Sequence, residues 1–107
     1  MCKSLRKHLV RLTTLLHHSQ EDHLASLVEE ALSASDENLR TFLRSNELWG
    51  GPGSIADQAG CEGGRKVKQR IESVLIDLGE EQIRDGILNE RTGMWVDTFR
   101  YWKESGV

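Results

Sequence analysis

Leucine residues recur at intervals of three and four along the start of the chain. Leu5, Leu9, Leu12 and Leu16 lie on one face if the backbone is helical, and polar residues occupy most positions between them. This pattern predicts an amphipathic helix over residues 4–18.

Two further helices are predicted before the middle of the chain. One carries the apolar residues between positions 24 and 32, and Ser19, three residues before an aspartate, fits the N-cap of that helix. The other begins after Ser35 and ends near Asn46. The two acidic residues that follow Ser35 suit the N-terminus of a helix.

The second half of the chain shows the same spacing. A stripe that includes Val67, Ile71 and Leu78 predicts a helix that starts at Arg65, and Gly79 fits its C-terminal stop. We expect another helix from Glu80 and a last one that Thr92 caps. The side chains predicted to point inward from the last helix are Trp95, Val96, Phe99 and Trp102.

Glycine and proline separate these two halves. The run Trp49-Gly50-Gly51-Pro52-Gly53 cannot continue a helix, because glycine costs roughly 1 kcal/mol and proline about 3 kcal/mol in a helix interior. Ser54 then fits the cap of a helical turn over residues 55–59. No window alternates between apolar and polar residues for long enough to predict a strand.

The pattern as a whole predicts an all-α fold, a compact bundle of about five helices with a structured glycine-rich loop in mid-chain. We expect a single domain over residues 1–107, with helical halves at 4–46 and 65–104 and the loop at 47–64. The length of 107 residues fits one domain with its own core.

Composition narrows the functional classes. Fourteen Lys and Arg against seventeen Asp and Glu give a net charge of −3, so general nucleic-acid binding is not expected. No apolar run approaches a membrane span, and the basic N-terminus lacks the apolar region of a signal peptide. Two cysteines do not form a disulfide framework. We therefore expect a cytoplasmic protein with no membrane association.

The mid-chain loop carries the first set of candidate binding residues. It is richer in apolar residues than a flexible linker, and an aromatic side chain there can anchor either a partner or the loop itself. Alternatively, Trp49 closes the core of its own domain, which needs its aromatic residues inside. The candidates for partner binding are Trp49, Gly51, Pro52, Ser54 and Asp57.

The start of the helix at Arg65 carries the second set. Backbone amides at a helix N-terminus attract anions, and basic side chains add to that attraction. The candidates for anion binding are Gly63, Gly64, Arg65, Lys66 and Arg70. No Gly-Lys-Ser or Gly-Lys-Thr of a phosphate-binding loop occurs, so a plain connection followed by a solvated basic face is the alternative.

The histidines are the remaining group with possible chemistry. His8, His17, His18 and His23 all lie in the first 23 residues, and His17 or His18 could approach His23 and share a metal. Recognised metal spacings and a third ligand are missing, so we interpret them as solvent-facing polar residues and predict no metal and no cofactor. We also find no catalytic set.

One short motif resembles a known group. The stretch Gly51-Pro52-Gly53-Ser54-Ile55-Ala56-Asp57 is similar to the Gly-x-Gly-Ser-hydrophobic-x-Asp loop between helices in small uncharacterised bacterial proteins. The resemblance implies a bacterial source and an ordered loop, and it carries no activity.

These observations favour a non-catalytic protein–protein interaction module of a regulatory, adaptor or immunity type. The alternative is a protein that binds a small ligand or anion through the glycine-rich loop and the basic residues at 65–70. A third possibility is a homodimer whose helices pair through Trp95, Phe99 and Trp102.

Overall fold

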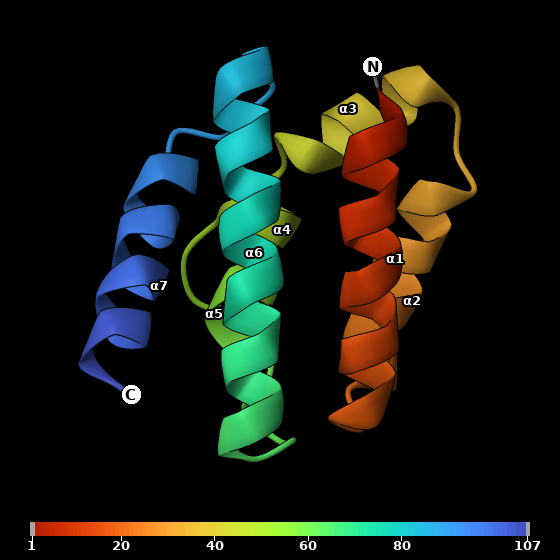
Figure 1. The fold of residues 1–107 in the computed structure, drawn as a ribbon. Coiled ribbons are helices and arrows are strands. Elements are labelled where there is room, and N and C mark those ends of the chain that lie inside the picture. Colours follow the sequence, from red (N-terminus) through yellow and green to blue (C-terminus); the bar gives the residue numbers. More distant parts are fainter. Residues whose placement is uncertain (1, 107) are drawn as a thin grey trace.

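The computed structural model describes residues 2–106, and over these residues the chain is helical without strands (Figure 1). The helices are α1 (Cys2–His18), α2 (Asp22–Leu32), α3 (Asp36–Leu43), α4 (Asn46–Trp49), α5 (Ile55–Gln58), α6 (Arg65–Asp85) and α7 (Thr92–Ser105). Five of them have eight residues or more, and α4 and α5 have four residues each. The prediction of an all-α bundle of about five helices is therefore confirmed.

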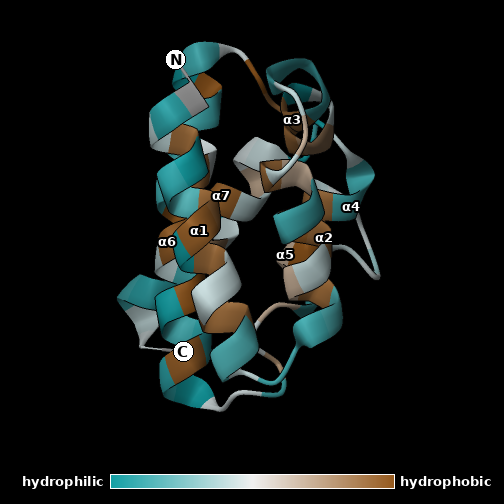
Figure 2. Ribbon diagram, turned by 90° about the vertical axis from the view of Figure 1, so that its right-hand side faces the viewer, coloured by the Kyte–Doolittle hydropathy of each residue, from teal (hydrophilic) through white to brown (hydrophobic). Residues whose placement is uncertain are grey.

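The helices form two layers. In Figure 1, α7, α6 and α1 lie side by side, and α6 runs antiparallel to both of its neighbours. Figure 2, turned by 90°, shows α2, α3, α4 and α5 together on the other side of this first layer. Because α6 lies in the middle of its layer, one of its faces stays open along the molecule's outer side.

The leucine stripe of α1 lies at the centre of the core. Leu5, Leu9, Leu12 and Leu16 are all fully buried, where α1 packs against α2 and α6. Each such side chain contributes about 1.5–3 kcal/mol when it leaves water. The periodicity of the sequence therefore identified the inward face of α1 correctly.

Serine caps begin the three short helices. Ser35, Ser45 and Ser54 each accept a hydrogen bond from the backbone N–H three residues further on. The prediction that Ser19 caps α2 is wrong: the N-cap residue is Glu21, and it makes no side-chain cap. Ser19 is instead buried, and its hydroxyl donates to the Leu16 carbonyl.

Part of the predicted loop is helical. The helix after Ser35 ends at Leu43, earlier than predicted, because Ser45 caps the separate turn α4. Trp49 is the last residue of α4 and is fully buried, with its Nε1 donating to Oε1 of Gln82 at 3.0 Å. The helical turn predicted after Ser54 is present as α5.

The prediction that Gly79 ends a helix is wrong, and so is the separate helix from Glu80. α6 continues through Gly79 to Asp85 and ends at Gly86, whose φ of 72° is the left-handed conformation that glycine tolerates best. Gly79 is required for a different reason. A Cβ at this position would lie inside 3.0 Å of Val96 Cγ2, so the glycine lets α7 approach α6 closely.

The last helix begins where the sequence predicts, but Thr92 is not its cap. The N-cap residue is Arg91, and the Thr92 hydroxyl accepts a hydrogen bond from Asn89 N at 2.9 Å. Phe99 is buried, and it stacks on Trp95 with ring centroids 5.4 Å apart. The inward face of α7 is therefore the predicted one.

Candidate functional site

Two of the five candidate partner-binding residues are built into the core. Trp49 is completely buried and Ser54 is 3% exposed, so neither side chain is available to a partner in this conformation. Gly51 is half-buried, and only Pro52 and Asp57 are exposed. The interpretation in which Trp49 closes the core agrees with this placement.

Three hydrogen bonds hold this loop in place. The Gly50 carbonyl accepts from Trp95 Nε1 and from the Ser54 hydroxyl, both at 3.0 Å. The Asp57 carboxylate accepts from Gly53 N at 3.1 Å. The loop is thus an ordered part of the scaffold, as the sequence predicts, and it positions α4 and α5 beneath α6.

Gly64 is the N-cap residue of α6, and the other four candidate anion-binding residues divide into two groups. Gly63 packs against Ser19, where an added Cβ would have no room, and the Arg65 guanidinium donates to the Gly106 carbonyl. Lys66 and Arg70, by contrast, line a common hollow of about 410 Å³ on the outer face of α6. Only these last two side chains are brought together as an anion site requires.

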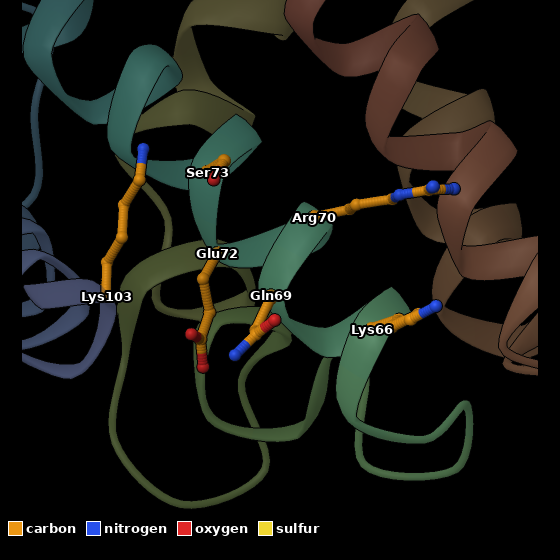
Figure 3. Close-up of a pocket in the computed structure, with 6 residues that line it drawn as sticks. All are labelled: Lys66, Gln69, Arg70, Glu72, Ser73 and Lys103. Atoms are coloured by element: carbon orange, nitrogen blue, oxygen red, sulfur yellow. The ribbon is translucent and has the colours of Figure 1, made fainter. Parts of the chain in front are cut away.

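This α6–α7 hollow also contains residues that the sequence did not single out. Figure 3 shows its lining: Lys66, Gln69, Arg70, Glu72, Ser73 and Lys103. Lys66 and Arg70 extend towards α1, whereas Glu72 and Lys103 lie on the α7 side of the helix (Figure 3). The cations of the hollow are therefore spread across α6 and do not converge on one point.

Glu72 is the buried acidic group of this hollow. Its side chain is 4% exposed, and Oε2 lies 3.5 Å from Lys68 Nζ without a hydrogen bond to any residue that the structure describes. Burial raises the pKa of Glu72, and the positive charge of Lys68 opposes that increase. Lys68 also lies 4.9 Å from the centroid of the Trp102 ring, so it is held between α6 and α7.

A second hollow of about 400 Å³ lies between α1 and α6. It is lined by Val10, Arg11, Thr14, Leu15, Arg70, Ser73 and Val74. Arg70 and Ser73 line both hollows, so the two adjoin on the N-terminal half of α6. We call the two hollows together the basic groove, after its cations Arg11, Lys66, Arg70 and Lys103.

Three of the four cations of the groove form no ion pair within the described residues, although the Glu72 carboxylate lines the same hollow. Arg11 lies 3.7 Å from Asp77, which is a weak exposed ion pair. No ion pair of Lys66, Arg70 or Lys103 is formed with the residues at 2–106. Sequence reasoning found Lys66 and Arg70 because they are neighbours on one helix. It missed Arg11 and Lys103, which only the packing of α1 and α7 brings to the same face.

The structure does not bring the histidines together into one site. His17 faces two carboxylates of α2, with Nδ1 2.7 Å from Asp22 and Nε2 3.4 Å from Glu29, and these hydrogen bonds raise its pKa. His8 departs from the prediction of a solvent-facing residue: its side chain is 18% exposed, and Nε2 lies 3.3 Å from Glu81. Within residues 2–106, no three His, Cys, Asp or Glu side chains are placed to hold a metal ion.

The aromatic side chains of α7 all make contacts within the chain. Phe99 is 2% exposed, Trp95 donates to the carbonyls of Trp49 and Gly50, and Trp102 packs edge-on against Phe99. A homodimer through these three rings would therefore need them to leave their present contacts.

The fold and the site define an all-α protein with an open, basic groove on one face. Its sequence matches no known family model, and neither a curated protein nor a solved structure is detectably similar to it. The resemblance of residues 51–57 to a loop of bacterial proteins thus stays a prediction. None of the helices between residues 2 and 106 is both long and apolar enough to cross a lipid bilayer.

Proposed function

We propose that this chain is a non-catalytic protein–protein interaction module and that the basic groove is its interaction surface. The observation that carries the proposal is the pair of adjoining hollows formed by α1, α6 and α7, which combine cations with the apolar side chains of Val10, Leu15 and Val74. A surface of this mixed character is typical of a protein interface. The non-catalytic role rests on the lack of a catalytic motif in the sequence.

The charge of the chain supports a heterologous partner. The whole chain has a net charge of −3, yet this face presents four cationic side chains. Such local concentration of charge steers oppositely charged partners towards the surface and disfavours others. We place the interaction in the cytoplasm, because the exposed free thiol of Cys61 suits a reducing compartment.

Cross-linking in a native lysate tests the proposal with matched variants. The groove variant is Arg70→Glu, and the control is Arg84→Glu, which reverses an exposed charge near the other end of the same helix. We expect a specific protein to be cross-linked to the wild type and to the control but not to the groove variant. Equal cross-linking of all three proteins, with circular dichroism showing that all are folded, would refute the groove as the interaction surface.

A second candidate function is the binding of a small anion by Lys66 and Arg70. It is favoured by the hollow that both side chains line, one turn apart on α6. Because Lys103 lies on the other side of the helix (Figure 3), only two cations would hold a compact ligand. A thermal-shift screen with inorganic phosphate and nucleotides tests it, since a ligand that binds the native state must raise the melting temperature.

A further inference from the structure

We propose that the segment recognised by the basic groove is an acidic, amphipathic helix of a partner protein. Its apolar side chain would enter the hollow between α1 and α6, and its acidic side chains would meet the cations on both sides of α6. This inference rests on the proposed function and names the chemistry of the partner.

The apolar site lies between α1 and α6. Val10 is 53% exposed, although it projects from a helix whose opposite face forms the core. Leu15 is half-buried beside it and Val74 is buried, so these three side chains provide an apolar wall and floor. A partner side chain of the size of leucine would lose apolar surface to this wall and floor, which favours binding.

Arg11 and Arg70 line this apolar site, and Lys66 and Lys103 lie in the adjoining α6–α7 hollow. Lys66 and Arg70 are four residues apart, which is roughly 6 Å along the helix axis at about 1.5 Å per residue. Arg11 lies on α1 and Lys103 on α7, so the positive charge extends across the full layer. Because these side chains come from three helices and do not converge, several separate carboxylates on one partner suit them better than one compact anion.

Beside the buried Glu72, two neutral polar side chains line the α6–α7 hollow. Neither the Gln69 amide nor the Ser73 hydroxyl forms a side-chain hydrogen bond within the described residues, and both line the α6–α7 hollow. These groups can donate to partner oxygens or accept from partner side chains without loss of an existing contact. The combination of apolar anchors with flanking charges corresponds to the recognition of an amphipathic helix in a groove.

Designed helical peptides test this inference without knowledge of the natural partner. The first peptide repeats glutamate with leucine at every fourth position, the second replaces leucine by serine, and the third replaces glutamate by lysine. Each carries a fluorescent label, and its anisotropy is measured against the full chain at low and high salt. We expect the first peptide to bind, the second to bind about tenfold more weakly, and the third not to bind. Binding of the first peptide should weaken at high salt, because exposed charges are screened.

Variants of the chain assign the binding to the groove. Arg70→Glu and Val10→Ser should each lower the affinity for the first peptide by about tenfold or more. Arg84→Glu and Met94→Ser alter exposed residues elsewhere and should leave this affinity unchanged. Equal binding of the lysine peptide, or unchanged binding by Arg70→Glu, would overturn the inference. Self-association of the chain that Arg70→Glu abolishes, seen by sedimentation, would also overturn it by showing a second copy in the groove.

The two proposals fail in different ways. If cross-linking in lysate depends on Arg70 but no acidic peptide binds, the groove is an interface and the proposed partner chemistry is wrong. If cross-linking does not depend on Arg70 either, the proposed function is also wrong.

Discussion

Gly79 gives the sharpest test of how this fold is held together. In a helix interior, replacement of glycine by alanine normally stabilises by about 1 kcal/mol, because alanine loses less backbone entropy on folding. At Gly79 the new Cβ would lie inside 3.0 Å of Val96 Cγ2 and 3.3 Å from Trp49 Cη2. Both neighbours are buried, so they cannot move into solvent to make room.

The expected effect of Gly79→Ala is therefore a loss of stability. Forcing an extra methyl group into a packed core costs about 1–3 kcal/mol, which exceeds the gain in helix propensity. We expect the free energy of unfolding to fall by about 1–2 kcal/mol, measured by urea denaturation and followed by circular dichroism. In a chain of this length, a loss of about 1 kcal/mol lowers the melting temperature by roughly 4–8 °C.

Two further variants isolate the cause. Gly93 also lies in a helix, but an added Cβ there meets nothing within 4 Å, so Gly93→Ala should be neutral or stabilising by up to about 1 kcal/mol. Val96→Ala removes the methyl groups that crowd residue 79, so Gly79→Ala should cost less in that background. A Gly79→Ala protein as stable as the wild type, or additive effects of the two substitutions, would refute the close approach of α6 and α7.

Three other predictions follow from single contacts. Gln82→Leu should lower the free energy of unfolding by at least about 2 kcal/mol, because the buried amide bonds the Trp49 indole and two backbone carbonyls. Wild-type stability in urea would contradict this. Ser54→Ala should cost about 1 kcal/mol through loss of the α5 cap, and Ser54→Asp should restore part of it; equal loss in both would point to the Gly50 contact instead. The stability that His17 contributes should be complete below its ordinary pKa of about 6.5 and should disappear as pH rises through the raised pKa of the folded state. Urea titrations across neutral pH should then show a flatter pH dependence for His17→Gln, and an unchanged profile would contradict the assignment.

Much of the local structure could be predicted because it depends on near neighbours in sequence. The leucine stripe of α1 defines its buried face, and Ser35 and Ser54 cap helices through amides three residues away. The errors occurred where a residue's role depends on a distant segment. Serine is a common N-cap residue, but Gly63 packs against Ser19. The Ser19 hydroxyl donates to the Leu16 carbonyl at the end of α1 instead of capping α2.

The candidate site could be predicted only in part for the same reason. Lys66 and Arg70 were recognised because one helical turn separates them, and both line the groove. Trp49 was ambiguous in sequence, since an aromatic residue in a glycine-rich stretch can face inward or outward. Its hydrogen bond to Gln82, 33 positions later in the chain, requires an inward position.

By itself, the sequence determined the all-α class, the inward faces of the long helices, the ordered loop and the basic start of α6. These properties follow from periodicity, capping and backbone preference, which act over a few residues. The tertiary structure decided that α6 continues through Gly79, that Trp49 belongs to the core, and that Arg11 and Lys103 flank α6. Those outcomes depend on which helices pack side by side, and contacts between segments far apart in the chain leave no periodic signal in the sequence.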